Sequence, residues 1–262
     1  MPAKAPAGTQ SIVRTFELLK ALSTRRTIGW RLTDLAAHCG LNHSTAHRIM
    51  ACLLAMRLVR QRADDKRYVP GPMLYEYALA TPSYFRFQAA CEKNLARVAK
   101  KTGWVGFMYL RSDEESVCTN RVGTYPGRQS FNDVGSRLPL AGLALGIAIL
   151  LALPRTEQEA VLAANWKALY SNAAHRKRAY REMWQRSKAQ GLGVNLGDVV
   201  PGIGSLGVAI LDAQGRPVAA IGASGPLEGV GERRLAEIRR LLQDEAKVLM
   251  REQAALIADI SV

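Results

Sequence analysis

The chain has 262 residues, of which 36 are Lys or Arg and 22 are Asp or Glu, so its formal net charge is +14. Hydrophobic residues make up 48% of the chain, which excludes a disordered or low-complexity protein because such chains lack the apolar surface that offsets the entropy of ordering. A strongly basic protein is attracted to polyanions such as nucleic acid or anionic lipid, although a basic enzyme is the alternative.

Targeting signals are missing from the sequence pattern. The first ten residues are small and polar and contain no apolar stretch typical of a signal peptide. The most apolar run, 138–153, contains Pro139 and two glycines and is too short to span a bilayer. The four cysteines form no CxxC pair, which disfavours a disulfide framework and a zinc ribbon. We therefore expect a cytoplasmic protein with no membrane segment, metal or cofactor.

The amino-terminal part alternates helical periodicity with a short hairpin pattern. In chain order it predicts helices at about 12–22, 35–39 and 42–56, strands at 58–62 and 66–69, and a helix at 73–80. Thr33 is the expected N-cap of the second helix. Asp64 and Asp65 are turn-forming residues between the two strands.

The remainder mixes hairpins with helices. It predicts helices at about 87–101, 144–153, 157–164, 173–190 and 231–259, and strands at 104–110, 115–122, 205–211 and 217–223. Strands that follow one another through short turns pair antiparallel, so we expect an α+β architecture with helices outside an antiparallel sheet. The expected domains are 1–70 and 87–262, with a linker helix and hinge at 71–86.

Residues 35–49 have the spacing of a helix-turn-helix. Ala36 is small where two helices would cross closely, Gly40 permits the positive φ of a tight turn, and Leu41 would fill the gap between the helices. The next helix then projects polar side chains outward, where they suit the major groove or its phosphates, while the basic hairpin suits a wing along the DNA backbone. The DNA-binding candidates are Asn42, His43, Ser44, Thr45, His47, Arg48, Arg60, Arg62, Lys66 and Arg67.

The distribution of charge supports this interpretation. Residues 1–80 carry twelve basic and five acidic side chains, so half of the net charge lies in under a third of the chain. The alternative is a three-helix element that serves only in dimerisation. His43 and His47, four residues apart, would share a helix face, but a metal site needs further ligands, so we favour a DNA-facing role for both.

These pieces, taken in order, resemble the IclR family of transcriptional regulators. The matching segments are 10–14, 16–19, 32–36, 44–48, 66–68, 71–72, 135–139, 145–146 and 217–226. The resemblance implies a winged helix-turn-helix, a linker helix and a GAF-like effector-binding domain. It also implies homodimers or tetramers that bind double-stranded operator DNA and control catabolic operons in response to small organic acids.

The resemblance also implies an effector site on one face of the second domain's sheet. The implied effector-binding residues are Leu140, Leu143, Asn195, Ile203, Ser205, Gly222 and Ser224. Serine hydroxyls can donate to a carboxylate, and leucine and isoleucine supply an apolar wall. Family members often carry polar side chains where this chain has Ala141, Leu143 and Ile147. A ligand with an apolar body, such as an aromatic acid, follows from this difference; the alternative is that the replaced side chains were structural.

An enzyme remains the second hypothesis: one that converts a small acid and is fused to a basic helical arm. No GxxxxGK[ST] phosphate loop occurs. The GxGxxG-like segment 202–207 opens a predicted strand instead of joining a strand to a helix, which disfavours a dinucleotide site. His175 is the one histidine beyond the first domain and no nucleophile elbow accompanies it. We therefore expect no catalytic residues.

Overall fold

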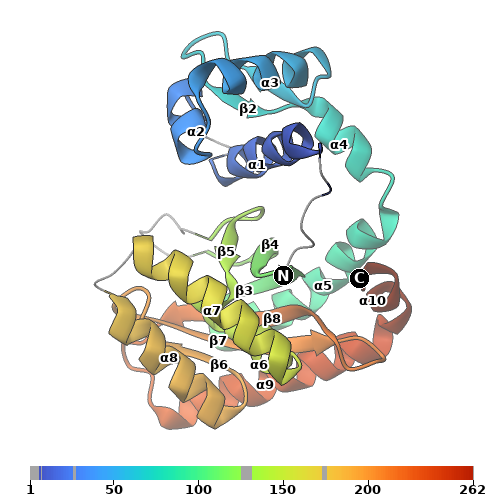
Figure 1. Cartoon of the computed structure of the whole chain (residues 1–262). Coiled ribbons are helices and arrows are strands. Elements are labelled where there is room, and N and C mark those ends of the chain that lie inside the picture. Colours follow the sequence, from blue (N-terminus) through green and yellow to red (C-terminus); the bar gives the residue numbers. More distant parts are fainter. Residues whose placement is uncertain (1–5, 7, 26–27, 125–131, 173–175, 262) are drawn as a thin grey trace. The chain divides into compact units, whose positions relative to one another are not determined.

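A computed structural model describes residues 6, 8–25, 28–124, 132–172 and 176–261 (Figure 1). The chain divides into two compact units, Pro2–Pro82 and Ser83–Val262. The linker predicted at 71–86 is thus divided between them. None of the helices in the described ranges is long and apolar enough to cross a membrane.

The described residues of the first unit form four helices and a two-stranded hairpin. Its elements are α1 (Gln10–Thr24), α2 (Leu32–His38), α3 (His43–Ala55), β1 (Val59–Gln61), β2 (Tyr68–Pro70) and α4 (Pro72–Ala78). The strands are antiparallel, with Arg60 opposite Val69. Leu18, Leu35 and Met50, from the three helices before the hairpin, are fully buried in one core. The apolar periodicity therefore folds as the expected helix-turn-helix with a wing.

The turn between α2 and α3 follows the sequence prediction, but the start of α2 does not. Gly40 has φ +63°, and its neighbour Leu41 donates its amide to the Ala36 carbonyl at 2.9 Å. The prediction of Thr33 as N-cap is wrong, because α2 begins at Leu32 with Arg31 in the capping position and no side-chain cap. Thr33 lies inside the first turn instead.

The second unit is a six-stranded antiparallel sheet with helices on both faces. Its strands are β3 (Val105–Ser112), β4 (Glu115–Val122), β5 (Arg137–Pro139), β6 (Gly193–Leu196), β7 (Ile203–Leu211) and β8 (Pro217–Pro226), in the order β5-β4-β3-β8-β7-β6. Its helices are α5 (Pro82–Thr102), α6 (Ala144–Leu151), α7 (Arg155–Asn172), α8 (Lys177–Gln190), α9 (Glu232–Glu252) and α10 (Ala254–Ile260). The α+β class expected from the sequence is confirmed.

Each face of this sheet has its own apolar core. One core joins the sheet to α5, α9 and α10 through residues such as Leu95, Leu206 and Leu242. The other joins the opposite face to a short 3-10 helix (Leu140–Gly142), α6, α7 and α8, through residues such as Phe107 and Ile147. Below, this second face is called the α6 face.

The structure changes several predicted boundaries. Helix α5 begins at Pro82 and not at Phe87, and α7 extends beyond the predicted range 157–164 at both ends. The single helix predicted at 231–259 is two helices that meet at Gln253. Residues 173–175 of the helix predicted at 173–190 lie outside the described residues, as does His175. Strands β5 and β6 were not predicted, because three or four residues flanked by Gly and Pro carry no readable alternation.

Candidate DNA-binding and effector-binding sites

Helix α3 presents a polar surface over a buried apolar one. His43, Ser44, His47 and Arg48 are exposed and Thr45 is half-buried, while the helix buries Ala46, Met50 and Leu53. Spacings of three and four residues put the exposed set on one side of the helix. The exposed groups include hydrogen-bond donors and acceptors of the kind that read base edges and phosphates.

Asn42 has a local structural role that the sequence analysis did not anticipate. Its side-chain oxygen accepts a hydrogen bond from the Thr45 amide at 2.8 Å, which makes Asn42 the N-cap of α3. The Ser44 hydroxyl donates to the same oxygen at 3.1 Å. This cap fixes where the helix begins, and it uses only the side-chain oxygen of Asn42, which is itself exposed.

The two histidines of α3 lie side by side. The ring centroids of His43 and His47 are 6.4 Å apart with the planes nearly parallel. In the described part of the chain, no group of three or more His, Cys, Asp or Glu side chains could hold a metal ion. The pair therefore lies on the exposed surface of α3 without the further ligands that zinc requires.

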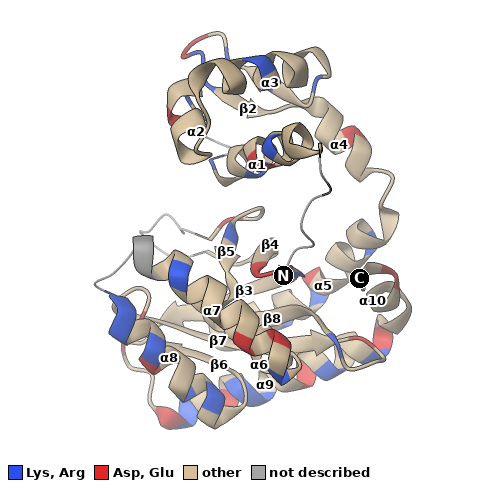
Figure 2. Ribbon diagram, in the orientation of Figure 1, with Lys and Arg blue, Asp and Glu red and all other residues tan. Residues whose placement is uncertain are grey.

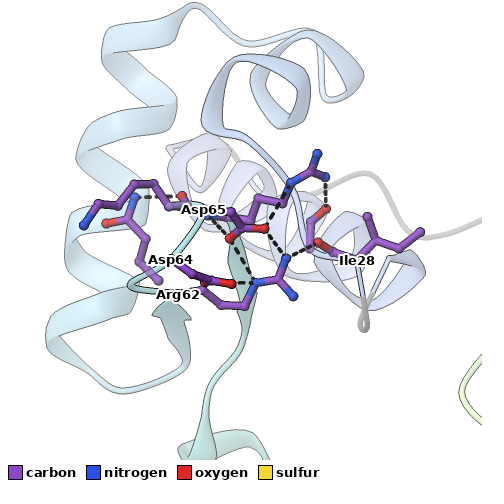
Figure 3. A network of polar contacts seen from close by, with 8 residues as sticks. Ile28, Arg62, Asp64 and Asp65 are labelled. Atoms are coloured by element: carbon purple, nitrogen blue, oxygen red, sulfur yellow. Dashed lines mark hydrogen bonds and ion pairs between the residues drawn. The ribbon is translucent and has the colours of Figure 1, made fainter.

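The four basic residues of the wing fall into two classes. Arg60 and Lys66 are exposed, whereas Arg62 and Arg67 are half-buried. Arg62 donates to both Asp65 oxygens and, through Nη2, to the Ile28 carbonyl at 2.7 Å (Figure 3). Arg67 donates to the Gly29 carbonyl at 3.3 Å and lies 3.4 Å from the Asp65 carboxylate.

We call these contacts of Arg62, Arg67 and Asp65 with the carbonyls of Ile28 and Gly29 the wing latch. The Arg62 side chain, by its hydrogen bond, holds the pKa of Asp65 below its usual range. Asp65 is therefore ionised at neutral pH, where it offsets part of the positive charge of both arginines. The latch fastens the wing to the segment before α2, and it leaves Arg60 and Lys66 as the wing cations that face solvent.

On the α6 face, three of the implied effector residues stand in one row across the sheet. Asn195 of β6 is opposite Ser205 of β7, Ser205 is opposite Ser224 of β8, and Ser224 is opposite Val105 of β3. Residues directly opposite one another project from the same face of a sheet. The two serines are half-buried and Asn195 is buried.

The polar groups of this row are bonded to one another and to the main chain. Ser205 donates to the Ser224 hydroxyl at 2.8 Å, and Ser224 donates onward to the Gly204 carbonyl at 3.0 Å. With both hydrogens engaged, the Ser205 oxygen is left as an acceptor. The Asn195 oxygen accepts from the Asp198 and Val199 amides, at 2.8 and 3.3 Å, and so closes the turn after β6.

A row of glycines runs beside it. Gly193 of β6 is opposite Gly207 of β7, which is opposite Gly222 of β8. A Cβ on Gly193 would lie 1.7 Å from the Ala144 carbonyl oxygen, and a Cβ on Gly207 would lie 2.7 Å from the Leu145 Cα. Glycine is needed here because the start of α6 rests directly on the sheet. Gly222 thus contacts Leu145, whose Cγ would be 2.7 Å from its Cβ.

The apolar members of the implied site lie around these rows. Leu140 and Leu143 are buried in the core of the α6 face, and Ile203 is half-buried at the start of β7. The sequence analysis missed Val105 and Phe107, which stand opposite Ser224 and Gly222 on that face. Their position in the strand predicted at 104–110 could have suggested them, but strand order cannot be read from one sequence.

Both units of the chain match known protein families. Residues 11–63 match the profile described as the IclR helix-turn-helix domain. Residues 86–251 match the profile described as the C-terminal region of bacterial transcriptional regulator IclR. The chain belongs to the IclR family of DNA-binding transcriptional regulators. The HTH-type transcriptional regulator KdgR of Escherichia coli is 24% identical to it, with 93% of this chain and 92% of KdgR covered.

Solved IclR-family structures have the same fold. A regulator from Brucella abortus is 20% identical, with 96% of this chain and 97% of that chain covered and a TM-score of 0.75. An IclR homologue from Microbacterium hydrocarbonoxydans, in complex with 4-hydroxybenzoate, is 18% identical, with 94% and 99% covered and a TM-score of 0.68. The winged helix-turn-helix and the α+β second unit are therefore those of the IclR fold.

Proposed function

We propose that this IclR-family protein regulates a catabolic operon, that a small organic acid with an apolar body controls it, and that it acts as a homodimer or tetramer in the cytoplasm. The observation that carries the proposal is the exposed polar surface of α3, held over a buried core and flanked by exposed wing cations. Under this proposal α3 enters the major groove, with Ser44, Thr45, His47 and Arg48 as its principal contacts.

The α6 face supports the effector part of the proposal. Half-buried serine hydroxyls border buried leucine and phenylalanine side chains there, and a few polar groups among apolar ones are typical of small-molecule sites. The homologue bound to 4-hydroxybenzoate adds an aromatic acid to the candidates. A ring-sized ligand would fit the leucines at positions 140 and 143 better than a two-carbon acid.

Helix α5 offers a route between ligand and DNA. Gln88 of α5 donates to the Thr119 carbonyl at 2.6 Å, and Asn120 donates to the Gln88 carbonyl at 2.9 Å. These bonds attach α5 to the bulge between β3 and β4. In a dimer, an effector that shifts this bulge would alter the spacing of the two DNA-binding units, and that spacing must match the operator half-sites.

Footprinting tests the proposal. The full chain is incubated with the DNA upstream of its own gene, with and without glyoxylate, pyruvate, benzoate or 4-hydroxybenzoate. We expect sequence-selective protection that one of the acids changes. Uniform binding to all DNA would contradict the proposal that the protein recognises an operator. Protection that none of the acids alters would contradict the proposal that a small acid is its effector.

A single substitution tests the docking of α3. Arg48→Ala should weaken operator binding by about 1–3 kcal/mol if Arg48 reads a base. If it binds a phosphate, the salt slope should fall by roughly one. Arg155→Ala is the matched control, because Arg155 is an exposed arginine of the second unit. Unchanged affinity and slope in Arg48→Ala at moderate salt would rule out this orientation.

A further inference from the structure

Two buried polar groups on the α6 face make no hydrogen bond of normal geometry within the described residues. They are the hydroxyl of Tyr109 on β3 and the Nε of Arg121 on β4. Arg121 is opposite Phe107, and Tyr109 is opposite Cys118, so both side chains leave the sheet on the side of the effector row. A buried donor without a well-made hydrogen bond destabilises a fold, so two of them on one face of the sheet call for an explanation.

The two groups have a common neighbourhood. Asp133 lies 3.5 Å from Nη1 of Arg121. Burial first, then the charge of Cys118 and a hydrogen bond with its thiol, and last the charge of Asp133, raise the pKa of Tyr109 well above its usual range, so its hydroxyl keeps its proton and can donate to a stronger acceptor than the thiol. Asp133 occupies the Nη1 end of the guanidinium, and the Nε edge is the side left for another acceptor. The Phe107 ring, 6.3 Å from the Tyr109 ring, supplies an apolar surface beside them.

We propose that Arg121 and Tyr109 bind the carboxylate of the effector. This inference rests on the proposed function and assigns the acid end of the ligand to residues outside the implied effector set. A carboxylate accepts from both donors at once, and its hydrogen bonds to a guanidinium are charge-assisted and therefore strong.

The opposite end of the ligand then faces the serines. Ser224 and Arg121 stand on strands two apart and are offset by two residues along the strands, so their backbones are roughly 12 Å apart at the usual strand spacing and rise, which a single-ring acid bridges with the help of the arginine side chain. Because the Ser205 oxygen is left as an acceptor, this end suits a ligand hydroxyl better than a second carboxylate. The ligand class is a ring acid with a hydroxyl far from its carboxylate.

Calorimetry on the full chain tests the assignment, with 4-hydroxybenzoate, benzoate, pyruvate and the neutral amide 4-hydroxybenzamide as probes. Wild type should bind the acid at least about 10-fold tighter than the amide, from one or two charge-assisted hydrogen bonds. Arg121→Met and Tyr109→Phe should each remove most of that preference, and Arg121→Lys should restore part of it. Arg155→Met, an exposed arginine, should behave as wild type.

The outcomes separate the two proposals. If an acid binds through Ser205, as judged by Ser205→Ala, but its affinity changes less than two-fold in Tyr109→Phe and Arg121→Met, the carboxylate assignment is wrong and the proposed function stands. If none of the acids binds wild type, both are overturned. Should Arg121→Met fail to fold, Tyr109→Phe, which removes one oxygen, and the acid-to-amide ratio of wild type decide.

Discussion

Among individual residues, chemical type alone did not separate exposed polar groups from those that are bonded within the fold. Arg60 and Arg62 are two residues apart on the same strand pattern, yet the first is exposed and the second is bonded within the wing latch. Asn42, a candidate for base reading, also caps α3 through its side-chain oxygen. What distinguishes them is the partner each finds within the fold, and a partner distant in the chain, such as Ile28 for Arg62, leaves no local trace in the sequence.

The two arginines form a matched pair of variants. Arg60→Ala should lower the salt slope of operator binding by about 0.9, as expected when one phosphate contact is lost, without changing the melting temperature. Arg62→Ala should lower the melting temperature of the first unit and weaken binding while the slope changes by less than half that amount. Salt-dependent binding isotherms and thermal melts measure both. Equal slope changes in the two variants would mean that Arg62 also reaches a phosphate.

Among elements, those with strong local signals were predictable. Helices α1, α3 and α9 carry clear apolar periodicity, and the turn before α3 has the glycine its φ requires. The short edge strands β5 and β6 were missed because their pairing depends on strands far along the chain. The contact of α6 with the glycine row was also beyond sequence reasoning, since the three glycines adjoin only once the sheet has formed.

That contact predicts a large stability loss from a small change. Gly193→Ala would place a methyl group 1.7 Å from the Ala144 carbonyl, so α6 or β6 must move, and overpacking of this kind costs about 3 kcal/mol or more. Gly231→Ala is the control, because nothing lies within 4 Å of a Cβ there, so its cost is limited to about 1 kcal/mol for the poorer helix N-cap that alanine makes. Urea denaturation compares them. A loss below about 1 kcal/mol in Gly193→Ala would show that α6 does not rest on the sheet as described.

For the whole molecule, the family and fold followed from the sequence, whereas the polar contacts that join α5 to α9 did not. Glu245 of α9 is buried and accepts from Arg97 at 2.9 and 2.7 Å and from Asn94 at 2.8 Å. Its two partners belong to α5, some 150 positions earlier in the chain. In the sequence, Glu245 is one more acidic residue on an amphipathic helix.

This contact gives a pH-dependent prediction. Burial by itself would raise the pKa of Glu245, but the hydrogen bonds from Arg97 and Asn94 outweigh it and lower the pKa below the ordinary value of 4.5. A lowered pKa means that the stabilisation is present above pH 4.5 and is lost as the pH falls through the folded-state value. Glu245→Gln should therefore cost about 1–2 kcal/mol at pH 7 and progressively less on acidification. Denaturation curves at several pH values test this, and a pH-independent difference would contradict it.

The charged residues of the second unit are distributed differently on its two most charged helices. The second unit carries exposed Lys and Arg along α8, while α9 mixes both signs (Figure 2). Exposed ion pairs such as Arg178 with Glu182 contribute little to stability. The net charge alone therefore predicts a polyanion partner, and the exposed surface of α3 is where we propose that this partner binds.

If the α6 face binds an effector as proposed, the glycine row bears on how the protein can change its ligand during evolution. The backbone of α6 contacts the backbone of β6 and β7 directly. The distance between α6 and the sheet is therefore fixed by main-chain atoms and not by side chains. Ligand selectivity would then change through side chains that border the glycine row, such as Ile203, while the contact between α6 and the sheet is unchanged. Under the proposed function, single substitutions at such bordering positions would change the ligand and leave the backbone contact below them in place.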